Sequence, residues 1–152
     1  MKSSIIAIGR WKRGPERDLF EHYAKRLSPP LELREFEERK KFSLDQRKNK
    51  EAELLLSAIP KGARLVVLDG SGKALSSVAL AKRIGDWRDT GTRQIAWLIG
   101  GAEGHGKTVL QAADLPLSLG HQTWPHLLVR AMLAEQLFRV QSILSGHPYH
   151  RE

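Results

Sequence analysis

The sequence of 152 residues contains no cysteine. That absence excludes disulfide bonds, thiolate zinc sites and cysteine nucleophiles, and it fits a reducing cytoplasm. Long apolar runs are also missing, because no stretch approaches the roughly 20 apolar residues that a membrane-spanning helix needs. The apolar stretch in Met1–Gly9 is too short for a secretory signal, and charged residues follow it at once. We therefore expect a soluble, cytoplasmic protein that does not bind a membrane.

Acidic residues are in the minority: 17 Asp and Glu stand against 25 Lys and Arg, which gives a formal net charge of +8. A small basic domain of this kind commonly binds a polyanion, and nucleic acid is the leading candidate. The alternative is a basic protein whose charge serves only solubility. An apolar fraction of 41% excludes global disorder. The length fits a single domain over residues 1–152.

Five apolar or alternating segments predict β-strands. They are Ser3–Gly9, Leu31–Glu37, Arg64–Asp69, Gln94–Ile99 and Leu115–Leu119, and the alternation in the second predicts a strand near the sheet edge. Helical spacing of apolar residues predicts five helices. They are Glu16–Leu27, a helix from the N-cap Ser43 to about Ile59, Ser76–Trp87, Gly106–Ala113, and a long helix from Pro125, as its first helical residue, to about Leu144. Strands that alternate with helices predict a three-layer α/β domain with a mostly parallel sheet.

The last predicted helix is apolar on more than one side, which means that it is buried on several sides. In so small a protein we expect a second subunit to cover one of those sides, and this predicts a dimer. The alternative is a central core helix in a monomer. Arg130 and Glu135 are charges within this helix, and they are either a structural ion pair or functional residues.

A glycine-rich segment follows the fourth predicted strand. Gly101–Thr108 (GAEGHGKT) fits the P-loop pattern G-x-x-x-x-G-K-[ST], which is typical of an NTPase. Two observations disfavour that function: the next strand does not end in a magnesium-orienting aspartate, and Glu103 would place a carboxylate among the phosphates. The alternative is that Gly100 and Gly101 let a flat ligand approach the backbone closely, while the GKT end only starts a helix.

The C-terminal segment His147–Glu152 (HPYHRE) is rich in histidine, tyrosine and arginine. We expect Gly146 to cap the last helix and Pro148 to keep the segment extended. These side chains can stack on a base, bind phosphate and move protons, and the alternative is a disordered chain end. His147 and His150 have no third ligand at a convincing spacing, so we expect no metal.

Several of these segments, together with Leu68-Asp69, closely resemble one known family. They are Leu98–Gly104 (LIGGAEG), Pro125–Arg130 (PHLLVR) and the HPYHRE tail, and they resemble the RlmH family of small SPOUT-class methyltransferases. The resemblance covers the whole chain, and the combination of tail and glycine loop makes it specific. The departures are local: family members often have proline at the position of Ala102, and the residues from His105 to Thr108 are not a family signature.

The resemblance implies an enzyme that uses S-adenosylmethionine to methylate N3 of a pseudouridine in 23S rRNA, pseudouridine 1915 in the family, on the assembled ribosome. It also implies a homodimer and an α/β sheet whose C-terminal segment is threaded into a deep trefoil knot. Reasoning from the residues alone does not lead to the knot, since chain connections are overwhelmingly unknotted.

By the same resemblance, the methyl donor lies among three loops, and backbone groups do most of its recognition. The donor-binding residues are Leu68, Gly100, Leu119, Gly120, His121, Gln122, Thr123 and Trp124. We hypothesise that the tail of one subunit reaches the donor site of the other. Arg151 would stabilise negative charge on the uracil-like ring, and His150 or Tyr149 would help to move the N3 proton. Arg130 would help to hold the tail or the nucleic acid.

A set of basic residues is suited to follow rRNA phosphates, although each alone is more simply solvated surface. The set comprises Arg10, Lys12, Arg13, Arg17, Arg39, Lys40, Lys41, Arg47 and Lys48. Three functions therefore stay open: an RNA methyltransferase, a P-loop NTPase that uses Gly101–Thr108, and a non-enzymatic ribosome-binding module.

Overall fold

The computed structural model describes residues 1–37 and 42–151, so Arg39, Lys40, Lys41 and Glu152 lie outside the described residues. Its sheet is made of β1 (Lys2–Ile8), β2 (Glu32–Phe36), β3 (Arg64–Lys73), β4 (Gln94–Ile99) and β5 (Leu115–Leu117). The strand order is β2-β1-β4-β3-β5, and all four pairings are parallel. The predicted parallel α/β sheet is therefore confirmed, as is the position of β2 at an edge. The trefoil knot stays a prediction.

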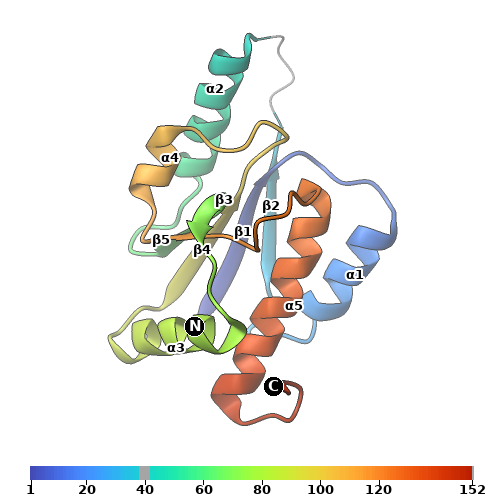
Figure 1. Cartoon of the computed structure of the whole chain (residues 1–152), viewed down its shortest axis with the longest axis vertical. Helices are drawn as coiled ribbons and strands as arrows, with labels where there is room; N and C mark the ends of the chain where they lie inside the picture. The colour runs from blue at the N-terminus through green and yellow to red at the C-terminus, as the bar shows by residue number, and fades with distance from the viewer. Residues whose placement is uncertain (38–41, 152) are drawn as a thin grey trace.

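Five helices cover the two faces of the sheet (Figure 1). One face carries α1 (Pro15–Ala24), α3 (Ser77–Asp89) and α5 (His126–Ser145), and the other carries α2 (Leu44–Ser57) and α4 (Lys107–Ala112). The central strands β1, β3 and β4 are apolar on both sides because each side meets a helical layer. Alternate residues of β1 show this: Ile5 packs into the core under α1, α3 and α5, and Ile6 packs into the core under α2 and α4. The predicted three layers are thus confirmed.

Local sequence signals fix most helix ends. Ser43 caps α2 as predicted, because its hydroxyl accepts from the backbone N–H of Gln46 while the Gln46 side chain accepts from the N–H of Ser43. Gly146 ends α5 with a φ of 73°, as predicted. The assignment of Pro125 as the first helical residue was wrong: its ψ of 134° is extended, so it is the N-cap and α5 begins at His126.

The ends of β1 and β2 differ from the prediction by one residue each, and the two larger differences both lie where β3 meets β5. β3 continues past Asp69 to Lys73, and β5 ends at Leu117 instead of Leu119. The register shifts between Leu68 and Lys73, both of which pair with Leu117. Gly72 permits this contact, because a Cβ at Gly72 would lie 2.7 Å from backbone atoms of Pro116 and Leu117.

Gly72→Ala should therefore push β5 away from β3. Since the opposing atoms are backbone, we expect the free energy of unfolding to fall by roughly 1–3 kcal/mol or more, as in other overpacked sites. Gly70→Ala is the matched control, because nothing lies within 4 Å of a Cβ at Gly70. Urea denaturation of both variants checks the prediction, and equal stabilities would contradict it.

Candidate functional site

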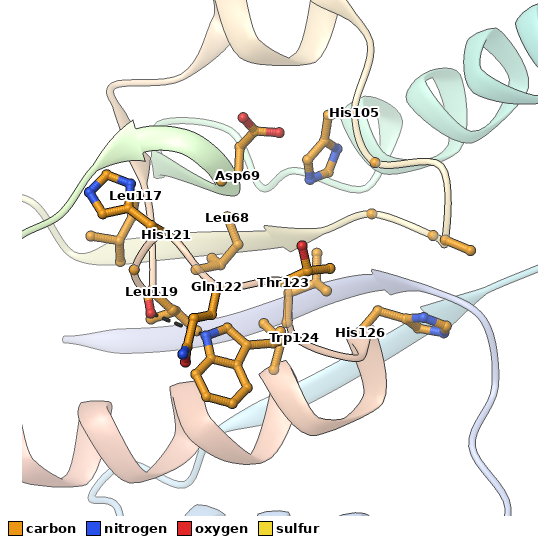
Figure 2. A pocket seen from close by; sticks show the side chains of 18 residues that line it. Leu68, Asp69, His105, Leu117, Leu119, His121, Gln122, Thr123, Trp124 and His126 are labelled. Carbon is orange, nitrogen blue, oxygen red and sulfur yellow. Dashed lines mark hydrogen bonds between the residues drawn. The ribbon is translucent and has the colours of Figure 1, made fainter.

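A cavity of about 300 Å³ opens at the carboxyl ends of β3, β4 and β5 (Figure 2). The segment Leu68–Gly70 of β3 and the loops after β4 and β5 enclose it, and the first turn of α5 adds His126 and Val129. All eight predicted donor-binding residues line this cavity, namely Leu68, Gly100, Leu119, Gly120, His121, Gln122, Thr123 and Trp124. Loops that follow parallel strands meet at one edge of a sheet, and ligands of open α/β folds bind at that edge. The structure therefore brings the predicted donor site together from three distant parts of the sequence.

The loop after β4 brings backbone to the cavity surface. A Cβ at Gly100 would lie 3.1 Å from Cε1 of His105 and 3.2 Å from the carbonyl group of Gly104. Gly104 has a φ of 75°, which favours glycine, and its N–H donates to the carbonyl of Gly101 at 3.0 Å. The turn is closed on itself, so it presents main-chain atoms to a ligand instead of side chains.

The loop after β5 is fixed by its own hydrogen bonds. The Ser118 hydroxyl donates to the carbonyl of Gly120 at 2.9 Å and accepts from the N–H of Gly120 at 3.1 Å. The indole Nε1 of Trp124 donates to the carbonyl of Leu119 at 3.3 Å (Figure 2). Gly120 has a φ of 110°, which lets the chain turn here. The loop backbone is therefore preorganised along the cavity wall.

Three polar side chains of the cavity were missed by sequence reasoning: Asp69, His105 and His126. Burial lowers the pKa of His105 below its usual value, and the Asp69 carboxylate and the carbonyls of Leu98 and Leu68 offset part of this effect. Nε2 of His105 is buried and has no hydrogen-bond partner among the described residues. Burial, and then the positive charge of Arg130, lower the pKa of His126. Both imidazoles therefore favour the neutral form.

The segment with the P-loop pattern does not form a phosphate cradle. Lys107 and Thr108 are exposed at the start of α4 and do not line the cavity, which confirms that the GKT end starts a helix. Gly101 lies against Glu51, whose Oε2 would be 2.9 Å from a Cβ at that position. Burial, and then the nearby Glu103, raise the pKa of Glu51. Two carboxyl groups beside the loop, those of Glu51 and Glu103, are unlike the N–H and lysine lining of a phosphate cradle.

The tail does not reach the cavity of its own chain. The tail lies at the end of α5, whereas the cavity lies at the start of this helix (Figure 1). The helix has 20 residues and is therefore about 30 Å long, which separates the two regions. The Tyr149 hydroxyl donates to Glu135 at 3.0 Å and lies 3.2 Å from the Tyr23 hydroxyl, from which it accepts. Nδ1 of His150 lies 3.2 Å from Nη1 of Arg139. The alternative of a disordered end is therefore wrong for these two residues, while Arg151 is exposed.

The hydrogen bonds of Tyr149 and His150 restrict their chemistry. Burial, followed by the hydrogen bonds to Tyr23 and Glu135, raises the pKa of Tyr149 far above its usual value, so the phenol stays protonated. Arginine can only donate, so Nδ1 of His150 accepts from Arg139 and the neutral ring carries its proton on Nε2. In this conformation the Tyr149 O–H is already donated to Glu135, and Nε2 of His150 is buried without a partner among the described residues.

Arg130 has a different role from the one expected. It is 0% exposed, and its guanidinium donates to Glu35 at 2.6 Å and to the carbonyls of Ile8 and Gly9 at 3.0 and 2.7 Å. The prediction that Arg130 holds the tail or nucleic acid is therefore wrong for this chain, because the side chain is fully buried and both terminal nitrogens already donate to Glu35, Ile8 and Gly9. Nor does it pair with Glu135, whose partner is Arg139 at 2.6 Å.

The described part of the chain holds no group of three or more His, Asp or Glu side chains arranged for a metal ion. Within the same residues, no helix combines the length and the apolarity needed to cross a membrane.

Comparisons with known proteins show the family of this chain. A family model described as "Predicted SPOUT methyltransferase" matches residues 1–150. Proteins named ribosomal RNA large subunit methyltransferase H are 56% identical in Paramagnetospirillum magneticum and 53% identical in Rhodospirillum centenum, over 99% of both chains in each case. A solved structure, the putative methyltransferase Lpg2936 from Legionella pneumophila with bound SAM, is 13% identical with a TM-score of 0.45 and covers 95% of this chain and 66% of its own. The chain therefore belongs to the RlmH family of SPOUT methyltransferases.

Proposed function

We propose that this protein is a homodimeric, S-adenosylmethionine-dependent enzyme that methylates N3 of a pseudouridine in 23S rRNA on the assembled ribosome. The observation that carries the proposal is the cavity in which three chain segments converge at the carboxyl edge of the sheet. Its relatives are named as methyltransferases of large-subunit rRNA, and the net charge of +8 suits an RNA substrate.

The cavity has the features that a nucleoside-type methyl donor needs. Leu68, Ile99 and Leu117 give it apolar walls, and the loops contribute backbone N–H and C=O groups for the edge of a base. Gly100 leaves free the space that a Cβ would fill. When bound, S-adenosylmethionine supplies a methyl group activated by its positively charged sulfur. The chain's own part is to hold and orient this molecule through Leu68, Gly100 and the loop 119–124.

The tail carries side chains suited to the second requirement of the reaction, which is to stabilise the base after it loses its N3 proton. Methylation at N3 requires the ring to lose a proton, which leaves negative charge on its oxygens. Tyr149 and His150 carry O–H and N–H groups that become donors to the ring once they leave Glu135 and Arg139, and the exposed Arg151 adds a positive charge. We propose that these groups, from the partner subunit, stabilise that charge.

A second copy of the chain is needed because one chain keeps its tail and its cavity apart. A groove of about 600 Å³ connects the two regions along α5. It shares Leu117, Leu119 and Gly120 with the cavity and reaches Tyr23 and Glu135 beside the tail. Half-buried Met132 also lines it. A partner helix in this groove would bring its tail toward the cavity, which supports the homodimer.

Calorimetry with S-adenosylmethionine and with ATP separates the three functions that the sequence leaves open. We expect binding of the former and none of the latter. Lys107→Ala should leave donor affinity unchanged, because Lys107 lies outside the cavity. Binding of ATP alone, lost in Lys107→Ala, would identify an NTPase. Binding of neither ligand would favour a ribosome-binding module.

Donor affinity should depend on pH through His105 and His126. Their pKa values lie below the usual value of about 6.5, so both rings are neutral at pH 7. As the pH falls through the lowered values, the rings become charged and repel the cationic sulfur of the donor. Calorimetry should therefore show constant affinity from pH 8 to 7 and binding that weakens only as the pH falls below the usual histidine pKa of about 6.5.

S-adenosylhomocysteine is the control ligand, since its sulfur is neutral and its affinity should change less over the same range. The variant His105→Gln should reduce the pH dependence for S-adenosylmethionine. Equal pH profiles for the two ligands would contradict a role of the histidines.

A further inference from the structure

The loop between β1 and α1 gathers positive charge around a small cavity. We call residues 10–17 the basic loop. They comprise the connection from β1 and the first residues of α1, and they contain Arg10, Lys12, Arg13 and Arg17. The cavity has a volume of about 250 Å³, and its lining is completed by Trp11, Glu16 and Leu127. Four cations therefore face one carboxylate, which makes this a site for an anion.

The cations of the basic loop are available to a ligand. Lys12 and Arg13 are exposed and have no ion-pair partner in the described ranges 1–37 and 42–151. Arg10 meets Glu37 only at 3.9 Å, with 62% of its side chain exposed. Arg17 pairs with Glu21 at 3.0 Å on the surface. Exposed pairs of this kind are weak, so phosphate groups can compete for both arginines.

The basic loop is held in a fixed position. Glu35 on β2 accepts from the backbone N–H of Trp11 at 3.0 Å and from Arg130 at 2.6 Å. The Trp11 ring packs edge-on against Phe20, with 5.0 Å between the ring centroids. The Arg130 guanidinium lies 4.9 Å from the centroid of the Trp11 ring. Arg130 also donates to the carbonyl of Gly9, directly before the loop. The buried Arg130 on α5 thus fixes the position of the basic loop and of its positively charged side chains.

The same part of α5 forms a wall of both cavities. His126 and Val129 line the donor cavity, while Leu127 between them lines the cavity of the basic loop. The end of β1 passes close by, since Nε2 of His126 would lie 3.7 Å from a Cβ at Gly9. Figure 2 shows the His126 side chain directed away from Trp124 and toward this end of β1. The basic loop therefore lies beside the donor cavity.

We propose that Arg10, Lys12, Arg13 and Arg17 bind backbone phosphates of the rRNA strand that carries the target base. Bound in this way, the strand is placed beside the donor cavity, and Arg130 and Glu35 act as positioning residues for the phosphate contacts. The proposal rests on the proposed function, because it takes rRNA as the substrate. It adds the surface that holds the strand.

The test compares two variants with the same change in charge. Lys12→Glu/Arg13→Glu reverses the two unpaired cations of the basic loop. Lys61→Glu/Arg93→Glu is the control, because these exposed residues precede β3 and β4 and so lie at the opposite edge of the sheet. Binding to ribosomes that lack the modification is measured between 50 and 300 mM salt, along with donor binding by calorimetry and methyl transfer.

We expect the loop variant to bind ribosomes at least about tenfold more weakly at low salt. Each lost phosphate contact should make the slope of log K against log salt shallower by about 0.7–0.9, so about 1.5 for two contacts. Donor affinity and melting temperature should match the unchanged protein, and the control variant should bind ribosomes normally. The milder Lys12→Gln/Arg13→Gln should show an intermediate loss, which keeps the test valid if the reversal disturbs folding.

Normal ribosome affinity and an unchanged salt slope in both loop variants would overturn the proposal. A photo-crosslinking residue at position 12 separates RNA from ribosomal proteins: crosslinks to 23S rRNA support the proposal, and crosslinks to proteins alone overturn it. Failure of the proposed function looks different, because the unaltered protein would then bind no donor or transfer no methyl group.

Discussion

Deletion of residues 147–152 is expected to reduce methyl transfer by about a thousandfold or more while leaving donor affinity within about twofold. The deletion removes Tyr149, His150 and Arg151, and the loss of a single preorganised donor to a developing anion already costs about 10²–10³ in rate. Donor affinity is spared because the donor is held by Leu68, Gly100 and the loop 119–124, whereas the tail acts on the ring that receives the methyl group. Single-turnover methylation of unmodified ribosomes and calorimetry measure the two quantities.

Mixed dimers show whether the tail acts across subunits. One chain carries the tail deletion, and the other carries Gly100→Val, whose side chain would collide with His105 and Gly104 and block the cavity. Each homodimer should be inactive. The mixed dimer should regain one working site, made of the free cavity of the first chain and the tail of the second. An inactive mixed dimer, or normal turnover by the tail-deleted homodimer, would contradict the shared site.

Glu35→Ala is expected to lower the free energy of unfolding by about 3 kcal/mol. The substitution leaves Arg130 fully buried without its carboxylate partner, and uncompensated buried charges of this kind cost about 3–5 kcal/mol. We take the lower end because 19% of the Glu35 side chain is exposed, so water can reach the gap. Urea denaturation at pH 7 measures the change.

The control for this variant is Glu37→Ala on the same segment, where the ion pair with Arg10 is exposed and 3.9 Å long. Pairs of that kind contribute less than about 1 kcal/mol. If Glu35→Ala and Glu37→Ala destabilise the protein equally, Arg130 does not depend on Glu35.

The sequence is a good guide to the local elements of this fold. Gln94–Ile99 was predicted with the observed ends because an unbroken apolar run marks a strand that is buried on both faces. Ser43 was predicted as an N-cap because serine commonly starts a helix, and its reciprocal hydrogen bonds with Gln46 confirm this. The errors at β3 and β5 arise from a contact between distant segments, since only the approach of Gly72 to Leu117 shows where the strands end.

The candidate site was predicted in part. Parallel strands bring their following loops to one edge, and the family resemblance named the eight residues that the structure gathers there. Arg130 was misassigned because its partner, Glu35, lies 95 positions away and no local pattern connects the two. His105 was missed because the ring reaches the cavity only through the closed turn from Gly101 to Gly104.

Mass spectrometry of 23S rRNA from cells that lack this protein tests most directly whether the protein methylates a pseudouridine. We predict the loss of one methyl group from N3 of a single pseudouridine. The unaltered protein should restore the methyl group, and the variant without residues 147–152 should not. Persistence of the methyl group in the cells that lack the protein, or a loss at a different nucleotide, would contradict the account.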